Sequence, residues 1–203
     1  MARVEYDLVT VGGGLAGSAL AKTIAEAGAR VLVLERETQF KDRVRGEGML
    51  PWGVVEARAL GIREELRITC GHDLFTWNVH LGPTPGPSRD LVTTTTAGTP
   101  ALSFYHPDMQ EVLLDAAARV GAEVRRGVTV SGVSPGTPPT VWLDGNGRRE
   151  EFSARLVIGA DGRASRVRSW AGFEVKRDPQ RLLVAGVLLD GTTVPEDGVH
   201  PEN

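Results

Sequence analysis

The chain contains 203 residues, of which 41% are hydrophobic and 24% are charged, a composition that supports a buried core and excludes an intrinsically disordered protein. Its 23 lysines and arginines are balanced by 26 acidic residues, so we expect no nucleic-acid-binding surface. The single cysteine, Cys70, excludes a disulfide framework, and we expect no metal site. No apolar run has transmembrane length, and the acidic Glu5 and Asp7 replace the basic residues of a secretion signal, which predicts a cytoplasmic protein without a membrane segment.

The first 34 residues have the pattern of a strand, a helix and a second strand. Residues 5–11 form a short apolar run, which the three glycines at 12–14 end. Residues 15–27 are small and helix-forming, and residues 30–34 are again apolar. A strand–helix–strand segment of about 30 residues is typical of a right-handed βαβ unit with parallel strands.

The rest of the chain continues to mix helices with strands. The Pro/Gly-rich segment 82–88 is expected to form a loop, and the β-branched run Thr93–Thr96 favours an exposed strand. Helices are expected over 50–60, 107–120 and 163–171. Strands are expected over 122–126, 127–134, 139–144, 149–154, 155–160 and 181–189.

Gly12, Gly14 and Gly17 have the spacing of a dinucleotide-binding turn between a strand and a helix. The first glycine permits the tight turn, the second lets the backbone approach a pyrophosphate, and the third lets the helix pack close to the strand. The helix begins at Leu15 and Ala16, whose backbone N–H groups would face the anion. A glycine-rich turn without a ligand is the alternative interpretation.

Glu35 stands at the end of the second strand, 18 positions after Gly17, where this turn requires an acidic residue. A carboxylate there accepts the two hydroxyl groups of an adenosine ribose and repels a 2′-phosphate. The nucleotide predicted at this site is therefore FAD or NAD and not NADP. The neighbouring Arg36 is included among the candidate nucleotide-binding residues.

A second motif distinguishes between these nucleotides. Residues 155–168 read RLVIGADGRASRVR, in which an apolar strand precedes Asp161-Gly162 and is followed by Ser165 and Arg168. This string resembles the DG fingerprint of the group A FAD-dependent monooxygenases, whose superfamily also contains geranylgeranyl reductase-like flavoproteins. Ala164 departs from the pattern, because a charged residue is more common at that position.

The resemblance implies several further contacts with FAD. Asp161 and Gly162 would lie near the flavin nucleotide, and an arginine of the loop after Glu35 would reach the pyrophosphate. Arg45 is the first candidate and Arg43 the second, because a guanidinium matches phosphate oxygens. His106 occupies the start of a helix where the family usually has an arginine or glutamine that contacts FAD.

The expected fold class is α/β: a Rossmann-type, FAD-binding parallel sheet with an antiparallel β-meander and the start of a substrate-domain sheet. Residues 1–70 and 105–172 are assigned to the nucleotide-binding domain, and residues 71–104 and 173–203 to the beginnings of the substrate domain. The resemblance covers about residues 5–190, and the family's second flavin fingerprint is absent. We therefore expect an N-terminal part of an enzyme that binds FAD weakly or not at all by itself.

The function that the resemblance implies is that of an FAD-dependent oxidoreductase. The most direct interpretation is a monooxygenase that uses NADH or NADPH and dioxygen to hydroxylate a small organic or aromatic substrate. The flavin carries this chemistry, so no side chain is named as catalytic. A flavin-dependent reductase of isoprenoid double bonds, an NAD-linked dehydrogenase and a non-catalytic nucleotide-binding fragment are the alternatives, and a homo-oligomer stays open.

Overall fold

The computed structural model describes residues 5–42, 47–81, 84–145 and 148–179, together with residues 181, 191, 198 and 199. The chain forms two compact units, which are Met1–Lys41 with Gln110–Leu183, and Asp42–Met109 with Val184–Asn203. Residues 42–70 and 105–109 fall in the second unit, whereas the sequence assigned them to the nucleotide-binding domain. The functional division into a nucleotide-binding and a substrate domain stays a prediction.

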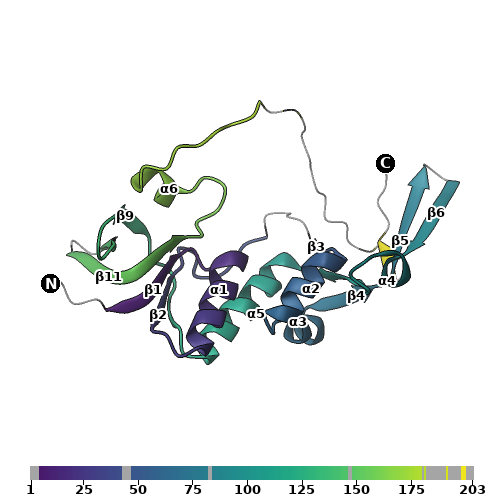
Figure 1. The fold of residues 1–203 in the computed structure, drawn as a ribbon, viewed down its shortest axis with the longest axis horizontal. Coiled ribbons are helices and arrows are strands. Elements are labelled where there is room, and N and C mark those ends of the chain that lie inside the picture. The colour runs from purple at the N-terminus through teal and green to yellow at the C-terminus, as the bar shows by residue number, and fades with distance from the viewer. Residues whose placement is uncertain are drawn as a thin grey trace. The chain divides into compact units, whose positions relative to one another are not determined.

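A six-stranded sheet forms the centre of the first unit, in the order β8-β2-β1-β11-β10-β9. Figure 1 shows β2, β1 and β11 of this sheet beside one another. Strands β8, β2, β1 and β11 are parallel to one another, whereas β9, β10 and β11 form an antiparallel meander. The expected α/β class with a Rossmann-type sheet and a meander is confirmed. The strands are β1 (Tyr6–Val11), β2 (Val31–Leu34), β8 (Glu123–Arg125), β9 (Val130–Ser134), β10 (Thr140–Gly145) and β11 (Arg148–Gly159).

Strand β11 joins the meander to the parallel sheet. Its first half pairs with β10, from Arg148 opposite Gly145 to Ser153 opposite Thr140. Its second half pairs with β1 and ends with Gly159 opposite Val11. The sequence predicted two separate strands over 149–154 and 155–160, which is wrong because one extended segment serves both neighbours. This continuity brings the segment after Gly159 next to the glycine turn that follows β1.

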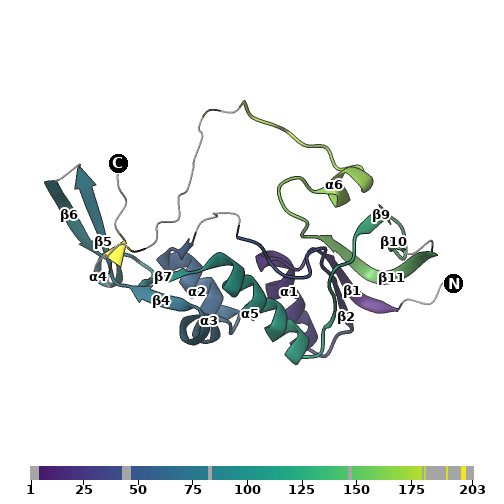
Figure 2. The same cartoon turned by 180° about the vertical axis from the view of Figure 1, so that it is seen from behind.

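Two apolar layers cover the two faces of this sheet. Helix α1 (Leu15–Glu26) and helix α5 (His106–Arg119) pack on one face, where Ala21, Ala25 and Leu114 contact strand residues such as Val33. The meander and helix α6 (Arg166–Trp170) contribute the other layer, which contains Val9, Leu32, Val141, Phe152 and Val167. Figure 2 shows α1 and α5 beside each other from the back. Both helices begin close to the positions that the sequence predicted.

The second unit contains short helices and two three-stranded sheets. One sheet has the order β3-β7-β4 and the other β12-β5-β6. The helices are α2 (Pro51–Ala59), α3 (Arg63–Thr69) and α4 (Leu91–Thr94). The strands are β3 (Gly48–Met49), β4 (Gly71–Leu74), β5 (Thr76–Leu81), β6 (Thr84–Asp90), β7 (Ala101–Phe104) and β12 (Gly198–Val199). Among the described residues, no helix has both the length and the apolar character needed to cross a membrane.

Two sequence predictions in this unit are wrong. Thr93 and Thr94 belong to helix α4 and not to a strand, because the Asp90 carboxylate caps the helix by accepting hydrogen bonds from Val92 N (2.8 Å) and Thr93 N (2.9 Å). Segment 84–88 belongs to strand β6 and not to a loop. Strand β6 lies at the edge of its sheet, and an edge strand tolerates proline because half of its backbone N–H groups have no partner strand. The strand predicted over 181–189 lies almost wholly outside the described residues.

Candidate functional site

The turn after β1 depends on close backbone contacts that exclude side chains. Gly12 has φ +103°, and a Cβ atom built on it would lie 2.4 Å from the carbonyl oxygen of Ala160. A Cβ atom on Gly17 would lie 1.9 Å from the carbonyl oxygen of Gly12. Glycine at both positions therefore lets helix α1 start directly against the turn, as the spacing predicted.

Gly14 has different surroundings, because only one flexible side chain lies near its free side. It is the N-cap of α1 with φ −72° and ψ −171°, and no side chain caps the helix. A Cβ atom built there would approach only the Gln110 side chain, with 3.3 Å to its Nε2 atom. The next two residues, Leu15 and Ala16, are exposed. The first backbone N–H groups of α1 are thus available to an anion, which the positive end of the helix dipole favours.

The Glu35 carboxylate lies directly at this turn although it is buried. Its Oε2 atom accepts a hydrogen bond from Gly13 N (2.6 Å), and its Oε1 atom accepts one from Glu37 N (2.8 Å). The side chain therefore connects the carboxyl end of β2 to the glycine turn. Each carboxylate oxygen can accept more than one hydrogen bond, so both retain acceptor capacity for ribose hydroxyl groups.

An ion pair fixes the loop that follows Glu35. Arg126 Nη2 lies 2.9 Å from Glu111 Oε1, and the same carboxylate accepts a hydrogen bond from Phe40 N (3.0 Å). The Arg126 guanidinium also stacks 4.9 Å from the centre of the Phe40 ring. This pairing, chiefly the hydrogen bond from Arg126, lowers the pKa of Glu111. The exposed Arg36 contacts Glu37 (3.3 Å), and nothing in these contacts directs it toward the turn.

Asp161 has a structural role at the start of helix α6. Its Oδ2 atom accepts hydrogen bonds from Arg166 N (2.6 Å) and Val167 N (3.1 Å), while its Oδ1 atom is buried and has no hydrogen-bond partner within the described residues. Gly162 follows with φ +84°. The segment touches the glycine turn through its backbone, since Ala160 N donates to Val11 O (2.8 Å). Direct contact of Asp161 or Gly162 with FAD stays a prediction.

The structure thus brings most of the predicted residues to one end of the first unit. Gly12, Gly14, Leu15, Ala16, Gly17 and Glu35 surround the start of α1, and Asp161 and Gly162 follow the adjacent strand. His106 begins α5 and belongs to the second compact unit. Arg43 and Arg45 lie outside the described residues.

Gln110 is the residue at this site that sequence reasoning missed. It lies one helical turn after His106 on α5, and its amide approaches Gly14. The signal in the sequence was this spacing of four residues, which places both side chains on the same face of a helix.

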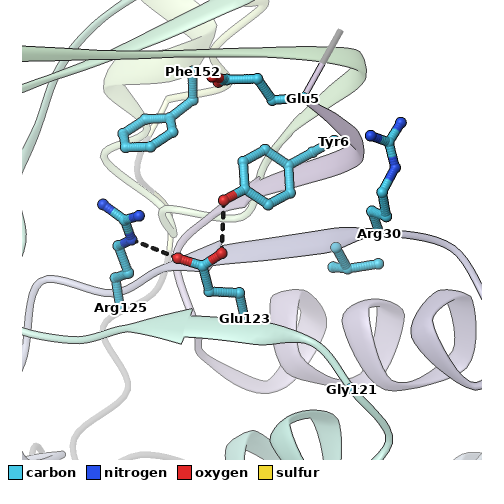
Figure 3. A pocket seen from close by; sticks show the side chains of 8 residues that line it. Glu5, Tyr6, Arg30, Gly121, Glu123, Arg125 and Phe152 are labelled. Carbon is cyan, nitrogen blue, oxygen red and sulfur yellow. Dashed lines mark hydrogen bonds and ion pairs between the residues drawn. The ribbon is translucent and has the colours of Figure 1, made fainter.

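A pocket of about 420 Å³ lies at the opposite end of the parallel strands, among residues that include the first residues of β1, β2 and β8 (Figure 3). Tyr6 donates a hydrogen bond to Glu123 Oε2 (2.6 Å), and Arg125 Nε donates to Glu123 Oε1 (2.8 Å). The Arg125 guanidinium stacks 4.8 Å from the centre of the Phe152 ring. Because nucleotides bind at the carboxyl ends of such strands, we interpret this cluster as a structural contact and not as the functional site.

This cluster predicts a pH dependence of stability at alkaline pH. Partial burial, assisted by the hydrogen bond to Glu123, raises the pKa of Tyr6 from 10.0 to about 12. The unfolded chain therefore loses the phenol proton first, and the stability contributed by Tyr6 is complete below pH 10 and is lost between pH 10 and 12. In urea unfolding measured across this range, Tyr6→Phe should lose stability less steeply than the unaltered chain. Parallel curves for the two proteins would contradict the prediction.

Almost the whole chain is similar to known proteins. The FAD binding domain family matches residues 5–200. The rifampicin monooxygenase of Streptomyces venezuelae is 30% identical over 178 residues, which are 87% of this chain and 36% of that protein. A digeranylgeranylglycerophospholipid reductase of Methanosarcina acetivorans is 29% identical over 197 residues, covering 91% of this chain and 46% of that protein. The chain spans less than half the length of either relative.

Solved structures give the same fold. The p-nitrophenol 4-monooxygenase of Pseudomonas putida superposes with a TM-score of 0.74 over 85% of this chain and 44% of its own, at 22% identity. The anhydrotetracycline hydroxylase of Streptomyces rimosus has a TM-score of 0.67 at 29% identity, over 81% of this chain and 33% of its own. The family match, the Rossmann-type sheet and the glycine turn agree. The chain therefore belongs to the FAD binding domain family, whose relatives include FAD-dependent monooxygenases and geranylgeranyl reductase-like flavoproteins, and its cofactor is FAD.

Proposed function

We propose that this chain holds the ADP half of FAD for an NAD(P)H-dependent monooxygenase that acts on a small organic or aromatic molecule. The observation that carries the proposal is the position of Glu35, whose buried carboxylate is hydrogen-bonded to Gly13 N (2.6 Å) beside the open start of α1. A ribose acceptor and a phosphate-binding helix terminus then lie next to each other, as the ADP half of FAD requires.

Different residues of the chain would bind different parts of FAD. The N–H groups at the start of α1 bind the pyrophosphate, and Gly14 leaves the space in which it approaches the backbone. Glu35 accepts the ribose hydroxyl groups, and the Glu111–Arg126 pair holds the loop behind it in place. FAD held by these residues would supply the redox chemistry between a nicotinamide and dioxygen. Arg45, Arg43 and His106 remain candidates for further FAD contacts, with Asp161 and Gly162 beside the flavin nucleotide.

Hydroxylation is favoured over other flavin reactions by two relatives whose names state this activity, the rifampicin monooxygenase and the anhydrotetracycline hydroxylase. A reductase of isoprenoid double bonds is the second candidate, supported by the digeranylgeranylglycerophospholipid reductase match over 197 residues. Oxygen uptake distinguishes the two. A monooxygenase consumes dioxygen together with NADH or NADPH when substrate is present, whereas a double-bond reductase turns over under anaerobic conditions.

Glu35 should determine which nucleotides bind. We expect the unaltered chain to bind AMP more tightly than adenosine 2′,5′-bisphosphate, which differs only by a 2′-phosphate that the carboxylate repels. In Glu35→Gln this preference should fall by about tenfold, which corresponds to about 1.4 kcal/mol, the scale of a lost hydrogen bond to a charged group. Isothermal titration with both ligands measures the ratio. Asp115→Asn removes an exposed carboxylate of helix α5 and serves as the control.

The ratio of two affinities is chosen because Glu35 also holds the turn through Gly13. A general loss of folding would weaken both ligands and leave their ratio unchanged. An unchanged preference in a folded Glu35→Gln protein would show that the ribose does not lie at the end of β2.

A further inference from the structure

We propose that Gln110 is a further cofactor-binding residue, whose side-chain amide donates a hydrogen bond to the pyrophosphate of FAD. The inference rests on the proposed function and adds a contact from helix α5 to a site otherwise formed by β1, α1 and β2. It assigns a specific task to a neutral side chain that no part of the dinucleotide turn motif includes.

Successive turns of α5 lie along successive glycines of the turn. A Cβ atom built on Gly13 would lie 3.2 Å from Leu114 Cδ1, and one built on Gly14 would lie 3.3 Å from Gln110 Nε2. Leu114 is buried in the apolar core and packs against the turn. Gln110, one helical turn earlier on the same face, is only half-buried and lies over the point where α1 begins.

The polar surroundings of Gln110 favour an anion as its partner. Its side chain has no hydrogen-bond partner among the described residues, whereas its neighbour Glu111 is engaged by Arg126 and by Phe40 N. The first turn of α1 contains no acidic side chain, and Gly14 provides no side-chain cap. The Gln110 amide therefore lies beside the start of α1, whose first N–H groups have no side-chain cap.

A neutral donor suits this position. Glutamine has two N–H donors and can hydrogen-bond a phosphate oxygen without the desolvation cost of a buried cation. The contact would involve the phosphates of the nucleotide and not its adenosine part. Adenosine, which has no phosphate, should therefore be insensitive to changes at Gln110, whereas ADP and FAD should respond.

The test compares Gln110→Glu with Gln110→Ala and with Ala118→Glu. The first change keeps the size of the side chain and places a negative charge beside the phosphates. Gln110→Ala removes the donor and retains a strong helix former. Ala118→Glu adds the same charge to an exposed position of the same helix and is the matched control. Affinities for FAD, ADP and adenosine are measured with the 203-residue chain by ligand-observed NMR titration.

We expect Gln110→Glu to weaken FAD and ADP binding by about a hundredfold and Gln110→Ala by about tenfold, because hydrogen bonds to charged groups contribute on this scale. Adenosine binding and the effect of Ala118→Glu should stay within about twofold of the unaltered chain. Unchanged FAD and ADP affinity in Gln110→Ala, or an equal loss for adenosine, overturns the inference about Gln110 alone. Failure of the unaltered chain to bind ADP would instead contradict the proposed function, which concerns the ADP half of FAD.

Discussion

Replacing Gly17 with alanine is expected to lower the free energy of unfolding of the first compact unit by about 3 kcal/mol or more. A Cβ atom at this position would lie 1.9 Å from the carbonyl oxygen of Gly12, which belongs to the backbone and cannot rotate away. The start of α1 must therefore move away from the turn. Within a helix, alanine normally makes a protein more stable than glycine does, by up to about 1 kcal/mol. A large loss of stability in Gly17→Ala would therefore have the opposite sign from the effect of helix propensity.

Urea unfolding followed by circular dichroism measures this effect. Gly48→Ala is the matched control, because a Cβ atom built on that glycine meets no atom within 4 Å. We expect the control to unfold close to the midpoint of the unaltered chain. A Gly17→Ala midpoint as high as that of Gly48→Ala would mean that α1 does not start against the turn.

Replacing Gly14 with valine should abolish nucleotide binding while the fold is retained. Gly14 has φ −72° and ψ −171°, a conformation that valine adopts readily, and only the flexible Gln110 side chain is near its free side. A branched side chain would occupy the volume in which the pyrophosphate meets the backbone. The loss should be about 3 kcal/mol or more, the scale of two hydrogen bonds to a charged group.

Parallel measurement of FAD affinity and unfolding midpoint separates this effect from that of Gly17→Ala. The expected combination is lost affinity with a midpoint near that of the unaltered chain. Retained FAD affinity in Gly14→Val would place the phosphates elsewhere, whereas a collapsed midpoint would show that Gly14 has a structural role like that of Gly17.

Local patterns in the sequence were sufficient to predict the β1–α1–β2 part of the fold. The apolar runs 5–11 and 30–34, separated by a glycine turn and a helix, became the parallel strands β1 and β2 with α1 between them. Glu35 was placed at the turn from spacing alone, and its hydrogen bond to Gly13 N agrees with that position. Such patterns predict well because strand, turn and helix are consecutive in the chain.

Features that depend on distant residues could not be predicted in the same way. The single strand β11 looked like two strands, since its pairing partners β10 and β1 are separated by most of the chain. Helix α4 depends on one capping carboxylate, Asp90, which outweighs the β-branched threonines. The approach of Gln110 to Gly14 required the packing of α5 against the turn, which is visible only in three dimensions.

The most direct test of the central claim, that the turn after β1 and Glu35 hold the ADP half of FAD, is a competition titration with the 203-residue chain. Fluorescence of added FAD reports binding, and ADP and FMN are the competitors. Because FMN lacks the ADP half, we predict that ADP displaces FAD and that FMN does not. Displacement by FMN with no effect of ADP would contradict the account, since the chain would then hold the flavin ring and not the nucleotide half.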